Sequence, residues 1–315
     1  MRLFIIGNGF DLGHGLPTGY WNFRTYLENR YPDFLQSFEE HYDIYPMMSD
    51  EEKQGLLWNR FESNLANIDE DSIINSCTSL DLGLESGDVG IKDTLYHHFL
   101  KEYSYIKKLS MYLKRWVRTI RIHDCPPRTS LIDKNNGDQY ITFNYTAVLE
   151  NVYDIPPTHI IHIHGSLRDY TIDPVLGHGN ISRIQAIQEK LSEAEESFDE
   201  KMSSICSVIK DYYMQTLKDT NMYIFSLSKI FDKKITEICV IGHSLDGIDI
   251  PYFSQIDQIT GKKLPWLIYI FKDSEADEKK ASLVSAGIDL SRIQTLLSDK
   301  FYDLAGDNHN HLTNK

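Results

Sequence analysis

Small and polar residues stand directly after five short apolar runs, and their side chains are of types that could bind and transform a ligand. The five polar stretches are residues 7–11, 144–146, 164–166, 242–244 and 272–274. They supply amide, hydroxyl, imidazole and carboxylate groups. If the apolar runs are parallel strands, these stretches lie at one edge of a sheet, where α/β proteins bind their ligands. The pattern therefore predicts a single binding site.

Three of these side chains suit the chemistry of bond cleavage. His164 could act as a general base, because imidazole titrates near neutral pH, or it could be a core histidine bonded to a backbone carbonyl. Asn144 could orient a water molecule or sugar hydroxyls, or it could cap the helix that follows. Asp11 stands where a strand-to-helix turn would aim a carboxylate at a bound ligand.

The first turn has the glycine spacing of a phosphate-binding loop. Gly7 and Gly9 carry no side chain, so backbone N–H groups between them could approach a phosphate closely. The dinucleotide fingerprint also needs a glycine at the sixth place, where this chain has Leu12, with Gly13 one position late. The turn is therefore either a ligand-binding loop or simply a tight turn.

Two other kinds of site fit the sequence less well. Residues 242–246 nearly match the Gly-x-Ser-x-Gly elbow of serine hydrolases, but Asp246 stands in place of the last glycine. Strand alternation would put His162 and His164 on one face, and His178 could complete a metal site with them. No cysteine or carboxylate cluster stands beside these histidines, so we expect no metal.

The apolar runs and the long polar stretches between them indicate an α/β protein with a mostly parallel sheet. The runs that predict strands are residues 3–6, 140–143, 159–163, 238–241 and 266–271. Residues from about 49 to 130 have helical periodicity, with one apolar stripe at Leu57, Trp58, Phe61 and Leu65, and we interpret its aromatic residues as core rather than as a ligand box. Residues from about 180 to 231 have a helical composition. No glycine-rich or proline-rich linker separates two domains. We therefore predict one domain over residues 1–315, with helical insertions at about 45–130 and 180–232.

Composition limits the function classes. The 315 residues carry 32 Lys and Arg against 46 Asp and Glu, a net charge of −14, which argues against a duplex-binding surface. The four cysteines are scattered, which argues against a disulfide framework or a zinc ribbon. The first strand begins at the N-terminus and no apolar run is long enough to cross a bilayer. We expect a cytoplasmic protein that makes no membrane contact.

Five motifs together resemble one known family. They read Ile-Gly-Asn-Gly-Phe-Asp-Leu at 6–12, His-Gly-Leu-Pro-Thr at 14–18, Thr-Phe-Asn-Tyr-Thr at 142–146, Ile-His-Gly at 163–165 and Ile-Gly-His-Ser-Leu at 241–245. This series resembles the AbiH family of bacterial abortive-infection proteins, which act against bacteriophage. The resemblance runs from the first residues to about residue 253, and it implies a defence function with an unknown phage-derived trigger.

More distantly, the same series is similar to the NAD site of sirtuins. That similarity implies a sirtuin-like Rossmann sheet with helices on both faces, in which Gly7 and Gly9 face the pyrophosphate. It also implies that Asn144 orients the ribose and a water, that His164 is the catalytic histidine and that Ser244 contacts the adenosine half. The chain departs from the sirtuin pattern at residue 146, where threonine replaces an aspartate, and it lacks the zinc module.

The two resemblances together imply an abortive-infection effector that hydrolyses the nicotinamide–ribose bond of NAD. The alternatives are a non-catalytic nucleotide sensor and an ADP-ribosyltransferase, and a homo-oligomer is possible in each case. The implied catalytic residues are Asn144, His164 and Asp11. The residues implied to bind NAD are Gly7, Asn8, Gly9, Phe10, Thr142, Thr146, Gly165, Gly242, His243 and Ser244.

Overall fold

The computed structural model describes residues 1–79, 105–165, 176–230, 234–245 and 247–304. The chain divides into two compact units. The first comprises Met1–Gly19, Lys114–Pro174 and Asp219–Lys315, and the second comprises Tyr20–Leu113 and Val175–Lys218. The two segments of the second unit overlap the predicted insertions at 45–130 and 180–232. The interpretation of the chain as one domain stays a prediction.

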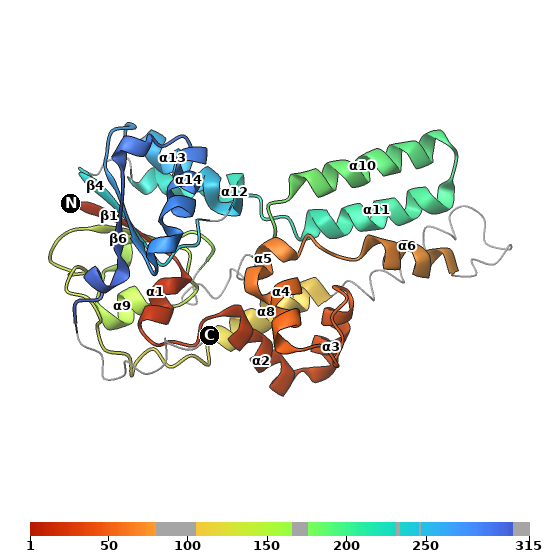
Figure 1. Cartoon of the computed structure of the whole chain (residues 1–315), viewed down its shortest axis with the longest axis horizontal. Helices are drawn as coiled ribbons and strands as arrows, with labels where there is room; N and C mark the ends of the chain where they lie inside the picture. The colour runs from red at the N-terminus through yellow and green to blue at the C-terminus, as the bar shows by residue number, and fades with distance from the viewer. Residues whose placement is uncertain (80–104, 166–175, 231–233, 246, 305–315) are drawn as a thin grey trace. The chain divides into compact units, whose positions relative to one another are not determined.

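The first unit is built on a parallel six-stranded sheet (Figure 1). Its strand order is β3-β2-β1-β4-β5-β6, and every neighbouring pair is parallel. The strands are β1 (Arg2–Ile6), β2 (Gln139–Thr142), β3 (Ile160–His162), β4 (Glu237–Ile241), β5 (Trp266–Ile270) and β6 (Ile293–Leu297). The prediction of an α/β fold with a parallel sheet is confirmed, and the architecture is Rossmann-like.

Five of the six strands lie where the apolar runs predict them, but β6 was not predicted. Along β6 only Ile293 is buried, and exposed residues alternate with partly exposed ones through Leu297. An edge strand covered on one side does not need a continuous apolar sequence, so its pattern resembles that of a surface loop.

Helices cover both faces of this sheet. They are α1 (Asn8–Gly13), α9 (Val148–Val152), α12 (Asn221–Ile224), α13 (Ile250–Ile259) and α14 (Ala276–Ser285). Along β1 the side chains alternate between two cores: Leu3 and Ile5 pack in the cluster that includes α13 and α14, and Phe4 and Ile6 pack in the cluster that includes α1 and α9. This double coverage explains why β1 is apolar at almost every position.

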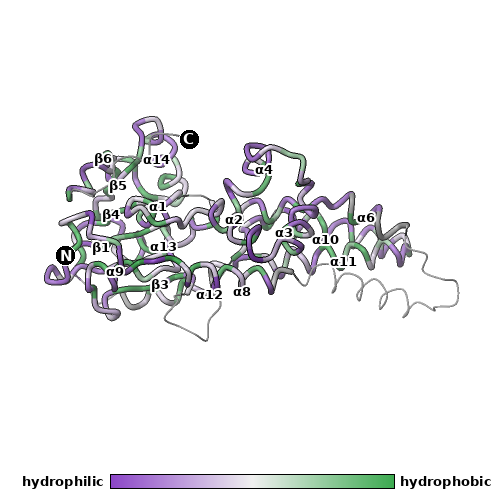
Figure 2. The backbone as a smooth tube through the Cα atoms, turned by 90° about the horizontal axis from the view of Figure 1, so that it is seen from below, coloured by the Kyte–Doolittle hydropathy of each residue, from purple (hydrophilic) through white to green (hydrophobic). Residues whose placement is uncertain are grey.

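The second unit is helical. Its helices are α2 (Tyr20–Arg30), α3 (Pro32–Glu40), α4 (Asp50–Leu56), α5 (Phe61–Asn64), α6 (Glu70–Ser79), α10 (Ile181–Glu196) and α11 (Glu200–Gln215), and α8 (Tyr105–Val117) crosses the boundary between the units. Figure 2 shows hydrophobic and hydrophilic residues alternating along α10 and α11. Trp58 and Phe61 are buried and stack at 4.8 Å, which confirms that this aromatic stripe is core.

Within the described residues, no helix combines the length and the apolar character that crossing a membrane requires. The predicted cytoplasmic location stays a prediction.

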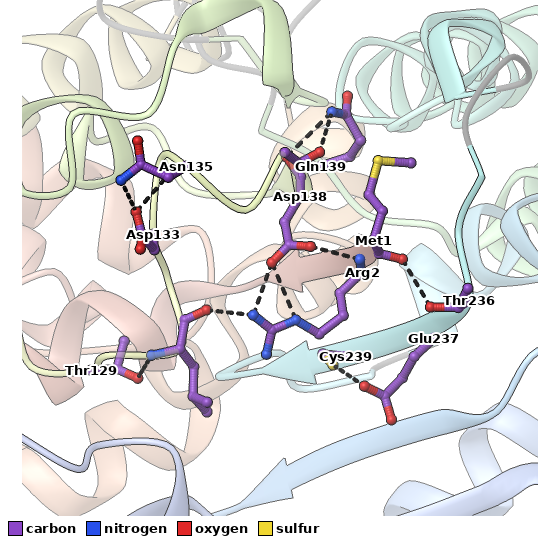
Figure 3. A network of polar contacts seen from close by, with 12 residues as sticks. Met1, Arg2, Thr129, Asp133, Asn135, Asp138, Gln139, Thr236, Glu237 and Cys239 are labelled. Atoms are coloured by element: carbon purple, nitrogen blue, oxygen red, sulfur yellow. Dashed lines mark hydrogen bonds and ion pairs between the residues drawn. The ribbon is translucent and has the colours of Figure 1, made fainter.

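An ion pair stabilises the amino edge of the sheet, where Arg2 begins β1 and Asp138 directly precedes β2 (Figure 3). The backbone N–H of Arg2 donates to Asp138 Oδ1 at 2.7 Å, and its guanidinium Nε and Nη2 donate to Oδ2 at 3.2 and 2.9 Å. Nη2 also donates to the carbonyl oxygen of Leu131 at 2.8 Å. These bonds join the starts of two neighbouring strands, at the opposite edge from the predicted site.

Candidate functional site

The strand order places the carboxyl ends of β3, β2, β1 and β4 side by side. The stretches that follow these four strands therefore meet at one edge of the sheet. The order of the strands reverses between β1 and β4, and α/β proteins of this topology bind ligands at such a reversal.

Asn144 lies at this edge, just after β2. The groups around it determine the orientation of its side-chain amide. Its Nδ2 donates to Asp11 Oδ1 at 2.8 Å and to the carbonyl oxygen of Gly7 at 3.1 Å. Because both neighbours are acceptors, the amide nitrogen must face them. The side-chain oxygen Oδ1 is buried and has no hydrogen-bond partner among the described residues. Asn144 does not cap a helix, since the N-cap of α9 is Ala147.

Asp11 forms a buried hydrogen-bonded network with Asn144 and Thr146. The Thr146 hydroxyl donates to Asp11 Oδ2 at 2.6 Å, so each oxygen of the carboxyl group accepts a hydrogen bond. Burial raises the pKa of Asp11 from 3.8 to about 7, and the bonds from Thr146 and Asn144 offset only part of this rise. Thr142 also helps to fix the backbone of Asn144, because its Oγ1 accepts from the backbone N–H of Asn144 at 3.1 Å.

His164 is buried beside the same edge, with only 2% of its surface exposed. Its ring packs edge-on against Phe143 at 5.2 Å, and the ring of Tyr252 lies 5.8 Å away. Its Nε2 lies 3.9 Å from Asp249 Oδ1. The imidazole of His164 is therefore packed among aromatic rings, with the carboxylate of Asp249 on one side.

His243, in the turn that follows β4, faces the same carboxylate. Its Nδ1 accepts from the backbone N–H of Leu245 at 2.9 Å, so neutral His243 carries its hydrogen on Nε2. That Nε2 lies 3.4 Å from Asp249 Oδ2. The rings of Phe143 and Phe253 pack against the imidazole at 4.4 and 5.1 Å.

The expectation that His162 and His164 share one face is wrong. His162 Nε2 bonds Glu150 Oε1 on α9 at 3.1 Å, whereas His164 packs against Phe143 and Tyr252, which belong to the core that includes α13. The reason is that β3 ends at His162, so strand alternation does not extend through the turn to residue 164.

The glycines of this edge allow two turns to pack closely. A Cβ on Gly7 would lie 2.6 Å from the carbonyl oxygen of Gly242, and one on Gly9 would lie 2.7 Å from its Cα. The N–H of Gly9 donates to the same carbonyl at 2.8 Å, and Gly242 has a φ of +67°. This packing by itself requires glycine at all three positions. The predicted contact of Gly7 and Gly9 with a phosphate stays a prediction.

The remaining residues predicted to bind NAD have different surroundings. Phe10 is a core residue, whose ring packs against Tyr153 and Phe301. Asn8 is exposed, and its Nδ2 donates to the carbonyl oxygen of Thr18 at 3.0 Å. Gly165 follows His164 with a φ of +89°.

Ser244 is exposed at the end of the β4 turn, and its backbone carbonyl accepts from Lys279 Nζ. The predicted roles of Ser244 and of the other residues in binding NAD stay predictions.

Within the part of the chain that the structure describes, no three His, Cys, Asp or Glu side chains gather in a way that could hold a metal ion. His178, the third ligand of the alternative metal site, belongs to the second unit. It is fully buried there, and its Nδ1 accepts from the backbone N–H of Asn180 at 3.0 Å.

Asp249 is the residue of this site that sequence reasoning missed. It ends the short helical turn η4 (Gly247–Asp249) and stands at the N-cap of α13, directly before Ile250 and Pro251. An aspartate before a helix is ordinarily interpreted as a cap. The available signal was its position a few residues after the polar stretch that follows β4.

The comparisons with known proteins concern most of the chain. The family model described as bacteriophage abortive infection AbiH matches residues 3–270. This range includes β1 from Leu3 onward, β2 to β5 and every site residue named above, Asp249 among them. Among curated proteins, none matches the sequence.

Proposed function

Because this chain belongs to the bacteriophage abortive infection AbiH family, we propose that its part in abortive infection is to hydrolyse the nicotinamide–ribose bond of NAD. Water is the second reactant, and the products are nicotinamide and ADP-ribose. Loss of NAD would stop the metabolism of an infected cell before the phage matures.

The observation that carries this proposal is the orientation of the Asn144 amide. Asp11 and Gly7 take both amide hydrogens, so Oδ1 is the group left to accept a hydrogen bond. A carbonyl-type oxygen suits a hydroxyl or a water as its donor. Cleavage of a glycosidic bond passes through an oxocarbenium-like centre, and a water must be held in position to attack that centre.

His164 follows the strand next to that of Asn144 and supplies the base. As the bond to nicotinamide breaks, water attacks the ribose carbon and its proton passes to the imidazole of His164. The Asp11 carboxyl group holds Asn144 in position through its hydrogen bond. Because burial raises its pKa to about 7, Asp11 adds negative charge near the cationic centre only once the pH is high enough to ionise it.

The test is incubation of the purified full chain with NAD, with nicotinamide measured by chromatography. Asn144→Ala and His164→Ala are each expected to lower release at least about a hundredfold, the usual contribution of a positioned acid–base group. Because both side chains are buried, circular dichroism must show that each variant is folded. Asn135→Ala and His159→Ala are the matched controls, since both residues precede their strands and lie away from the carboxyl edge.

The outcome also separates the alternatives. NAD binding without release of nicotinamide would favour a nucleotide sensor and would contradict hydrolysis. Release of nicotinamide with ADP-ribose retained on a macromolecule would favour a transferase. Equal activity of wild type and His164→Ala would remove His164 from the mechanism.

A further inference from the structure

Asp249 stands at a helix N-cap, but its side chain does not cap the helix. At this position an aspartate ordinarily accepts from a backbone N–H of the first helical turn. The side chain of Asp249 makes no such bond to α13. Its carboxylate instead faces the imidazoles of His243 and His164. Because the Asp249 side chain does not cap α13 but faces two buried histidines, its contacts indicate a role in positioning those histidines.

We propose that Asp249 is a positioning residue, which fixes the ring of His243 and favours the protonated form of His164; the second part rests on the proposed function of His164 as the base. The two oxygens of the carboxylate divide these tasks, because Oδ2 faces His243 and Oδ1 faces His164.

The position of the His243 ring is determined by the contacts of its two nitrogens. Leu245 donates its backbone N–H to Nδ1 at 2.9 Å, which leaves the hydrogen on Nε2. His243 Nε2 lies 3.4 Å from Asp249 Oδ2, so the imidazole has a hydrogen bond at Nδ1 and a carboxylate in Coulomb contact beside Nε2. His243 directly follows Gly242, which packs against the turn after β1. Asp249 thus anchors the β4 turn on the turn that carries Gly7 and Gly9.

The effect on His164 is electrostatic. The separation of 3.9 Å between His164 Nε2 and Asp249 Oδ1 is too long for a hydrogen bond, but it is within the range of strong Coulomb attraction. The side chain of Asp249 is only 15% exposed and that of His164 only 3%, so water screens this attraction weakly. The carboxylate therefore favours the imidazolium that forms when His164 takes the proton of the attacking water.

The kinetic test compares Asp249→Asn and Asp249→Glu with wild type. Asp249→Asn keeps the size and an acceptor oxygen but loses the charge, so kcat for nicotinamide release is expected to fall at least about tenfold with little change in KM. Asp249→Glu is expected to recover part of the loss. Combined with His164→Ala, Asp249→Asn is expected to cause no further loss, because it acts through His164.

Asp257→Asn is the matched control for loss of stability alone. Asp257 is a buried acid on the same helix, and it pairs with Arg292 and Trp266 rather than with a histidine. Its replacement is expected to lower the resistance to urea with kcat unchanged. Wild-type kcat in Asp249→Asn, or an additive loss in the double variant, would overturn the effect on His164.

A second measurement does not depend on turnover. The Nε2–H proton of His243 is expected to give a slowly exchanging NMR signal in wild type and in Asp249→Asn, which keeps an acceptor oxygen. The signal is expected to be lost in Asp249→Ala. Its persistence in Asp249→Ala would overturn the hold on His243. If wild type released no nicotinamide, the proposed function would fail, and this signal would still test Asp249.

Discussion

Replacement of Asp11 by asparagine is expected to remove a pH dependence of folding between about pH 4 and pH 7. The Asp11 carboxyl group is fully buried, and burial raises its pKa from 3.8 to about 7. Over that interval the unfolded chain has released this proton, while the folded chain still holds it. The contribution of Asp11 to stability is therefore complete below about pH 4 and is lost as the pH rises through 7.

The magnitude follows from the two pKa values. Their difference, at about 1.4 kcal/mol for each pH unit, corresponds to a loss on the order of 4 kcal/mol. An asparagine at position 11 has almost the same shape. Its oxygen can accept from Asn144, and its amide nitrogen can donate to the Thr146 hydroxyl, which can act as an acceptor. The variant should therefore keep the folded geometry without the ionisable group.

Urea unfolding of wild type and Asp11→Asn at a series of pH values from 4 to 8 measures this effect. All other titrating groups are common to both proteins, so the difference between their free energies of unfolding isolates Asp11. As the pH rises, the free energy of unfolding of the variant is expected to increase relative to that of wild type, by on the order of 4 kcal/mol in total. A difference that stays constant across the series would refute the assignment of a buried, proton-retaining Asp11.

Two further predictions concern packing. Gly9→Ala is expected to destabilise the fold by about 2 kcal/mol or more, because the new Cβ would clash with the backbone of Gly242. Gly55→Ala has no atom near its new Cβ and is expected to stabilise α4 by up to about 1 kcal/mol. Urea unfolding of each variant measures both effects. Asp138→Asn weakens the bonds to Arg2 and is expected to cost about 2 kcal/mol with nicotinamide release unchanged, so a selective loss of activity would contradict the separation of the two sheet edges.

The sequence alone determined the class of fold and most of the sheet. A parallel strand covered on both faces must be apolar at nearly every position, and β1, β4 and β5 can be recognised in the sequence in this way. The order of the chain also shows which residues follow each strand, so Asn144, His164 and Ser244 could be placed at the carboxyl edge in advance. The motifs at these positions led to the AbiH family, which the family model confirms.

Tertiary structure decided what each of these residues touches. Asn144 meets Asp11 only because β2 pairs with β1, and Gly9 meets Gly242 only because β4 pairs with β1 on its other side. Asp249 is 85 positions from His164 along the chain, so no spacing could have joined them. Local periodicity reports which face of an element is buried. Contacts across strands depend instead on strand order and on how the turns pack, and these arise only when the whole sheet forms.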